Sequence, residues 1–112
     1  MSLDELRAQI IDFRDKRDWE QFHHIKDLIS GLSIEVSELA ELFLWKDEKQ
    51  IQEINPTSIK EEVADIFILL NYICAHYDID LIEATQNKLK KNHQKYPIEK
   101  SFGSNKKYTE LS

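Results

Sequence analysis

The scarcity of glycine and proline restricts the fold of this chain most, because both residues are needed at the tight turns of a many-stranded sheet. Only two of each occur among 112 residues. Apolar residues instead recur at spacings of three and four, which is the period of an amphipathic helix. The sequence therefore predicts an all-α subunit built from a few long helices.

Four helices are expected from this period and from the capping signals between its segments. They cover about residues 3–17, 25–45, 58–77 and 81–95, with a bend or short helix over 18–24 and a polar loop over 46–57. Ser58 and Glu61 have the spacing of a capping box, and Pro97 ends the fourth helix. Residues 1–100 are thus predicted to form one helical domain, followed by an irregular tail over residues 101–112.

Charge and hydropathy exclude several classes of protein. The net charge of −6 speaks against a generic nucleic-acid partner, which requires basic surface. The longest apolar run, Ile66 to Leu70, is too short to cross a membrane, and the N-terminal segment is too charged for a signal peptide. The single cysteine, Cys74, lies in an apolar run and permits neither an intrachain disulfide nor a cysteine-based zinc site. A cytoplasmic protein without a membrane or nucleic-acid partner is expected.

Two of the predicted helices carry carboxylates where an apolar side chain is expected. On a helical wheel, Glu35 falls inside the leucine stripe of the second helix, and Glu38 follows three residues later on its shoulder. Glu62 falls in the middle of the apolar face of the third helix, again with an acidic residue, Asp65, three residues on. Each helix therefore presents an acidic pair whose first member faces the core.

A divalent cation is the simplest way to keep such carboxylates ionised. An ionised carboxylate in a dry core is costly unless an opposite charge meets it, and lysine and arginine are scarce on these faces. Oxygen ligands suit Mg²⁺ or Mn²⁺ better than zinc or copper. The alternative is a set of solvated carboxylates, because a single E-x-x-E pair on a helix is common and usually faces water.

Short motifs spread along nearly the whole chain point to a known family. They are E-V-S-E-L-A-E-L at 35–42, E-E-V-A-D at 61–65, R-D-W-E-Q-F-H at 17–23, L-A-E-L-F-L-W-K at 39–46, K-Y-P at 95–97 and K-Y-T-E-L at 107–111. The first two resemble the E-x-x-E and E-x-x-D signature of the MazG-like all-α nucleotide pyrophosphohydrolases. The others resemble the dCTP pyrophosphatase branch of that family.

The resemblance implies a reaction and an assembly. The reaction is the Mg²⁺-dependent hydrolysis of a nucleoside triphosphate, dCTP or a modified dCTP, to the monophosphate and pyrophosphate, as in the house-cleaning of nucleotide pools. Its metal ligands would be Glu35, Glu38, Glu62 and Asp65. A carboxylate not fully committed to the metal would take the proton of the attacking water, with Glu38 favoured and Glu35 as the second candidate. The assembly is a homo-oligomer of MazG-like four-helix bundles, a tetramer built as a dimer of dimers, in which neighbouring subunits complete each site.

The resemblance also implies substrate-binding residues. For the phosphates these are Lys88, Asn92, Lys95 and Tyr96, at near-helical spacing. For the base they are Trp19, His23 and Trp45, whose rings can stack on a nucleobase. The structural alternatives are a solvated basic last turn that complements the helix dipole, and tryptophans that belong to the core.

Other functions remain open at this point. A broad-specificity or dUTP-directed MazG-like hydrolase would use the same carboxylates, and a non-catalytic helical nucleotide-binding or dimerisation module would use them without turnover. A di-iron carboxylate bundle requires two Glu-x-x-His pairs, whereas only Glu20 and His23 have that spacing.

Overall fold

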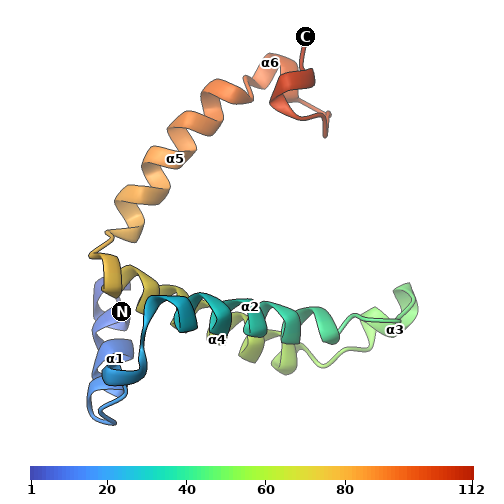
Figure 1. Cartoon of the computed structure of the whole chain (residues 1–112). Coiled ribbons are helices and arrows are strands. Elements are labelled where there is room, and N and C mark those ends of the chain that lie inside the picture. The colour runs from blue at the N-terminus through green and yellow to red at the C-terminus, as the bar shows by residue number, and fades with distance from the viewer. The chain divides into compact units, whose positions relative to one another are not determined.

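The structure, a computed structural model, describes all residues from Met1 to Ser112 and contains helices but no strand (Figure 1). Its elements are α1 (Leu3–Asp15), the 3₁₀ helix η1 (Glu20–Phe22), α2 (Ile25–Glu41), α3 (Glu48–Gln52), α4 (Pro56–Tyr77), α5 (Leu81–Lys95), α6 (Ile98–Ser101) and the 3₁₀ helix η2 (Tyr108–Glu110). None of these helices is long and apolar enough to cross a membrane. The predicted all-α class is confirmed.

The chain has six α-helices rather than the four that were predicted. The four expected helices correspond to α1, α2, α4 and α5, while α3 and α6 are additional short helices. The helix α3 lies inside the predicted loop because Asp47 and Gln50 cap each other. The Gln50 N–H donates to Asp47 Oδ1 and the Asp47 N–H donates to Gln50 Oε1, both at 2.9 Å. Such reciprocal capping stabilises a short helix that has no hydrophobic period of its own.

The start of α4 also differs from the prediction. Asn55, not Ser58, is the N-cap: its side-chain oxygen accepts the Thr57 N–H at 3.0 Å, and Pro56 occupies the first turn. Proline suits that position because its fixed φ is already helical and its missing N–H would have no partner there. The predicted capping box at Ser58 is therefore wrong, whereas the start of α5 at Leu81 is confirmed.

The chain forms two compact units, Met1–Asp78 and Ile79–Ser112. In the first unit α2 and α4 lie side by side, and α1 packs against α4 (Figure 1). Their small core is centred on Ile10, Leu28 and Tyr72. The second unit holds α5, α6 and η2. The division into a domain of residues 1–100 and a tail of residues 101–112 stays a prediction.

The helices α2 and α4 approach closely at Gly31. A Cβ atom added there would lie 3.2 Å from Leu69 Cδ1, which is tighter than an ordinary contact. Gly31 precedes Glu35 by about one helical turn. The small residue therefore lets the two helices come together next to the acidic pairs.

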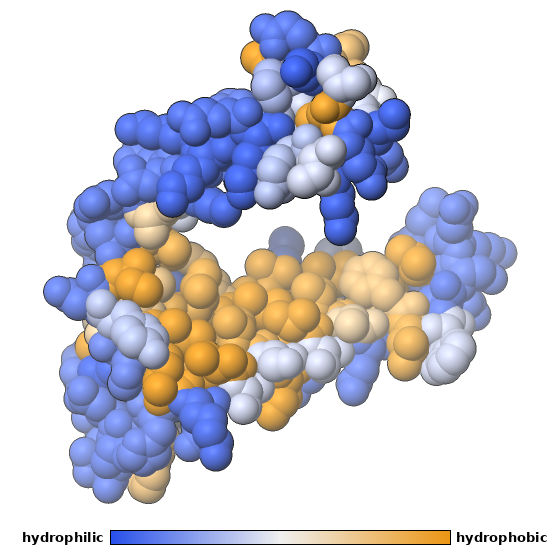
Figure 2. All heavy atoms as spheres, turned by 45° about the horizontal axis from the view of Figure 1, so that its top comes forward, coloured by the Kyte–Doolittle hydropathy of each residue, from blue (hydrophilic) through white to orange (hydrophobic).

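Much of the hydrophobic surface of the α2–α4 pair is exposed. Figure 2 shows hydrophobic side chains gathered over these helices. On α2, Ile29 is 55% and Val36 is 48% exposed, and on α4, Val63 is 51% exposed. A broad apolar surface of this kind is typical of a face that another protein surface covers.

Candidate functional site

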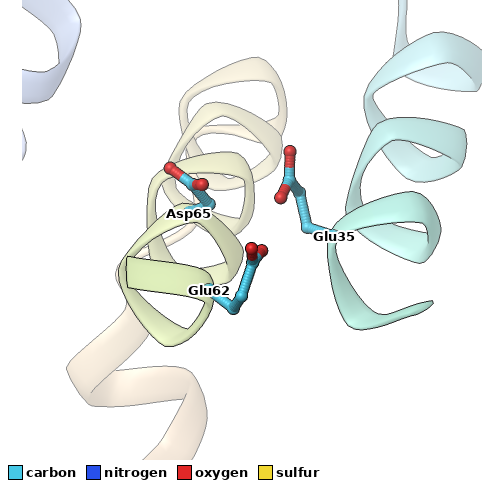
Figure 3. A group of neighbouring side chains, drawn as sticks. All are labelled: Glu35, Glu62 and Asp65. Carbon is cyan, nitrogen blue, oxygen red and sulfur yellow. The ribbon is translucent and has the colours of Figure 1, made fainter. Parts of the chain in front are cut away.

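Three carboxylates from the two packed helices converge on one point. The helix α2 directs Glu35 toward α4, which contributes Glu62 and Asp65 (Figure 3). One oxygen atom from each of these side chains lies within 4.8 Å of the other two. The acidic pairs expected from the helical wheel thus face each other across the helix interface.

The positions of these carboxylates raise their pKa values. Glu35 and Glu62 are each partly buried, and the Oε2 atom of each is buried without a hydrogen-bond partner. Burial, followed by the hydrogen bond and negative charge of Glu38, raises the pKa of Glu35 to about 7. The same causes in the same order raise the pKa of Glu62. The raised pKa values mean that the neighbouring groups of the folded chain do not compensate the negative charge of these carboxylates.

This set of donors fits a hard divalent cation. Its members are all carboxylate oxygens, and two of those oxygens are buried with no partner. Mg²⁺ and Mn²⁺ take such ligands, and a bound cation would reverse the effects that raise the two pKa values. The fourth predicted ligand, Glu38, lies outside the group of three but close enough to affect both Glu35 and Glu62.

Two of the predicted base-binding residues lie near the junction of α1 and α4. Trp19 directly precedes η1, is 43% exposed and packs edge-on against Phe13, with 5.7 Å between ring centroids. The His23 ring lies 4.6 Å from that of Tyr72 on α4. Burial, and then the charge of Arg14, lowers the pKa of His23, so its imidazole is neutral at physiological pH.

The third predicted base-binding residue, Trp45, is exposed and strained. It lies just beyond the end of α2, has a φ of 61° and is 92% exposed. A bulky residue in this left-handed region costs about 1–3 kcal/mol, and such strain is concentrated at functional sites. The indole is therefore available to a ligand or to another subunit.

Two cavities meet at Tyr72 in the first unit. The polar one has a volume of about 290 Å³ and is lined by Arg14, Glu20, His23, Tyr72 and His76, with Leu28 and Ala75. The apolar one has a volume of about 220 Å³ and is lined by Leu6, Gln9, Ile10, Phe13, Ile68 and Tyr72. Sequence reasoning missed Arg14 and Tyr72 because no motif links residues that meet only through packing.

The predicted phosphate-binding residues lie in the second unit, on α5 and at its end. Lys95 also lines a cavity of about 560 Å³, together with Lys91, Gln94, Pro97, Lys100, Tyr108 and Leu111. The Lys95 ammonium lies 4.9 Å from the Tyr108 ring centroid. The prediction missed Lys91 and Lys100, although a signal was present: residues 79–112 hold seven lysines and only four acidic residues.

Comparisons with known proteins find relatives that align with most of this chain. The model of the MazG-like family matches residues 30–111. The dCTP pyrophosphatase 1 of Rattus norvegicus is 38% identical over 98% of this chain and 68% of its own length, and the Homo sapiens protein of the same name is 37% identical over the same shares. The crystal structure of a pyrophosphatase from Archaeoglobus fulgidus has a TM-score of 0.79 and 38% identity, covering 85% of this chain and 92% of its own. The resemblance drawn from the sequence motifs is confirmed.

Proposed function

The chain belongs to the MazG-like family, and we propose that it is a nucleoside triphosphate pyrophosphohydrolase that acts on dCTP or a modified dCTP. The products would be the nucleoside monophosphate and pyrophosphate, consistent with a role in nucleotide-pool house-cleaning. The observation that carries this proposal is the convergence of Glu35, Glu62 and Asp65 within 4.8 Å in a chain 37–39% identical to dCTP pyrophosphatases. A dUTP-directed or broad-specificity relative would share these carboxylates, so base choice is part of the test.

Glu35, Glu62 and Asp65 would hold Mg²⁺, or Mn²⁺ in its place, with Glu38 as the fourth ligand. The metal, when bound, would neutralise phosphate charge and polarise the α-phosphorus toward attack by water. Glu38 is the carboxylate outside the group of three, so it would be the ligand least committed to the metal and would accept the proton of that water. Glu35 is the second candidate for this role.

The remaining substrate contacts fall into a phosphate group and a base group. Lys88, Asn92, Lys95 and Tyr96 would bind the phosphates, and the lysine-rich lining of the neighbouring cavity supports this role. Trp19 and Trp45 would stack on the base, with His23 at its edge. The exposure of both indoles supports these assignments.

We further propose that the working form is a homo-oligomer, a dimer of dimers in which subunits complete one another's sites. The support is the exposed apolar surface of α2 and α4, which includes Ile29, Val36 and Val63. An isolated subunit buries few side chains, and covering this surface would remove a large apolar area from water.

The first test is a panel of canonical and 5-substituted dNTPs with Mg²⁺, following the monophosphate and pyrophosphate by chromatography. We expect pyrophosphate release that EDTA abolishes and that is fastest with a cytosine nucleotide. A folded, metal-supplied protein that turns over no nucleotide would favour the non-catalytic binding module instead.

Adjacent residues on α4 provide a matched pair of variants. Glu62→Gln removes a carboxylate from the convergent group, and we expect at least a 100-fold loss of kcat. Glu61→Gln removes the same charge one position away, where the side chain is exposed and outside the group, and should retain most of the activity. Equal losses in the two variants would contradict the assignment of Glu62.

A further inference from the structure

The polar cavity beside Tyr72 carries a charged pair whose hydrogen-bonding pattern matches one type of base. Arg14 is held in the cavity wall, with its side chain only 11% exposed, while the Glu20 side chain is 71% exposed at the mouth. Arg14 Nε and Nη2 bind Asp15 Oδ1 at 2.9 and 2.8 Å, which fixes the orientation of the guanidinium. Its Nη2 atom lies 3.5 Å from Glu20 Oε2.

The contact between Arg14 and Glu20 is loose. A charge-assisted hydrogen bond between such groups is ordinarily about 2.7–2.9 Å long, whereas this one is 3.5 Å. In addition, His23 Nδ1 is buried without a hydrogen-bond partner at the same cavity. The cavity therefore offers polar groups whose hydrogen-bonding capacity the chain does not use up.

We propose that this cavity recognises the Watson–Crick edge of cytosine, with Glu20 and Arg14 as the residues that determine base specificity. The carboxylate accepts a hydrogen bond from the exocyclic amine of cytosine, and the guanidinium donates to its N3 and O2 atoms. Uracil and thymine present an oxygen to the carboxylate and an N–H in place of the N3 acceptor, so these two contacts become repulsive and only the contact with O2 remains. A site built on hydrogen bonds rejects an analogue that leaves its groups unpaired.

The position of the cavity suits a nucleotide whose phosphates lie at the carboxylates. Tyr72 and Asp65 are both on α4 and seven residues apart, which is about 10 Å along the helix axis. A nucleotide can span that length between its α-phosphate and the far edge of its base. Trp19 directly precedes Glu20, so a half-exposed ring is available beside the recognising carboxylate.

The neighbouring apolar cavity is a poorer candidate for base discrimination. Its walls are hydrocarbon and aromatic except for Gln9 and the Tyr72 hydroxyl. An apolar wall contributes to affinity for any base but does not distinguish cytosine from uracil. The polar cavity is therefore the one whose side chains can distinguish cytosine from uracil.

The inference rests on the proposed function for its substrate, but its test does not require turnover. The full-length protein is titrated with dCMP and with dUMP, neither of which has a bond for it to hydrolyse, and the ratio of dissociation constants is measured by calorimetry. We expect the wild-type protein to bind dCMP at least roughly tenfold more tightly than dUMP. In Glu20→Gln the ratio should fall toward one, with a gain in dUMP affinity because the amide can donate to the uracil oxygen.

Two further variants separate recognition from structure. Asp12→Asn removes another carboxylate of α1, one that pairs with Lys16 at 2.9 Å and lies outside the cavity lining, and it should keep the wild-type ratio. Arg14→Lys keeps the charge but loses the planar pair of donors, so its ratio should fall as in Glu20→Gln.

Equal binding of the two nucleotides by the wild-type protein, no measurable binding of dCMP, or a ratio unchanged in Glu20→Gln would overturn the proposal. Absence of triphosphate hydrolysis with an intact dCMP preference would instead contradict only the proposed function.

Discussion

At the scale of single residues, Glu35 links the stability of the metal-free protein to pH. Folding raises its pKa from 4.5 to about 7, so between these values the folded state binds a proton that the unfolded state releases. The stabilisation from this group is therefore fully present below pH 4.5 and is lost as the pH rises through 7. Solvent screens part of this effect, which leaves about 1 kcal/mol.

Glu35→Gln should remove that dependence. Glutamine resembles the protonated acid at every pH, so the variant should match the wild-type protein near pH 5 and exceed its unfolding free energy by about 1 kcal/mol at pH 8. The measurement is urea unfolding in EDTA at both pH values. Glu41→Gln, at an exposed position of the same helix, is the control and should show no such difference. A stability gain that is the same at pH 5 and pH 8 would argue against this role of Glu35.

The backbone conformation of Trp45 lowers the stability of the protein, while its indole would contribute to substrate binding. Its positive φ is costly for any residue with a Cβ atom, and glycine alone adopts it freely. The free energy of unfolding of Trp45→Gly should therefore exceed that of Trp45→Ala by roughly 1 kcal/mol, and Trp45→Gly should unfold at the higher temperature. Both variants lack the indole, so both should raise KM for the nucleotide and weaken base choice. If kcat alone fell in both, stacking on the base would be the wrong role for Trp45.

The sequence predicts some of these residue-scale features and not others. The position of Glu35 and Glu62 on apolar stripes is visible from helical period alone, and the structure brings these two residues together with Asp65. The backbone strain at Trp45 is invisible in sequence, because nothing in L-F-L-W-K requires a left-handed residue. The pairing of Arg14 with Glu20 is also hidden, since it depends on the turn between α1 and η1.

At the scale of helices, Gly31 controls the approach of α2 to α4. Gly31→Leu should push a side chain into Leu69, which already lies 3.2 Å from the position of a bare Cβ. We expect a loss of about 1–3 kcal/mol in stability, together with lower activity because Glu35 follows Gly31 by one turn. Thermal unfolding and kcat, measured on the same preparation, test both effects.

Gly31→Ala is the matched control for this variant. Alanine gains about 1 kcal/mol in helix propensity, and the clash it meets is with the end of a flexible leucine side chain. The two effects oppose each other, so the stability should change little. Wild-type stability in Gly31→Leu would mean that α2 and α4 are not held at this point.

The sequence predicts the presence of the long helices better than it predicts the residues at which helices begin. The hydrophobic period predicted four helices because each is long enough to repeat its apolar stripe. The starts of α3 and α4 depend instead on single polar side chains, Asp47 and Asn55, which compete with neighbours of similar capping ability such as Ser58. For α4 the deciding signal is Pro56, which favours the first turn of a helix and so selects Asn55 as the cap.

At the scale of the whole molecule, charge is divided along the chain. Residues 1–78 hold 17 acidic and 8 basic residues, whereas residues 79–112 hold 4 and 7. A triphosphate accompanied by a divalent cation requires both kinds of charge, carboxylates for the metal and ammonium groups for the phosphates. The net charge of −6 speaks against a generic nucleic-acid surface, but it hides this division because it is a sum over the whole chain.

Oligomerisation is testable through the apolar surface of α2. Ile29 is 55% exposed and is not one of the converging carboxylates, so Ile29→Asp should weaken subunit association without removing any of them. If neighbouring subunits complete each site, the variant should lose activity together with its assembly, and both should recover in part at high protein concentration by mass action. Light scattering and turnover are measured over the same dilution series.

Ser30→Asp adds the same charge at an exposed polar position of the helix and should retain both assembly and activity. A dissociated Ile29→Asp protein with full activity would mean that each subunit carries a complete site.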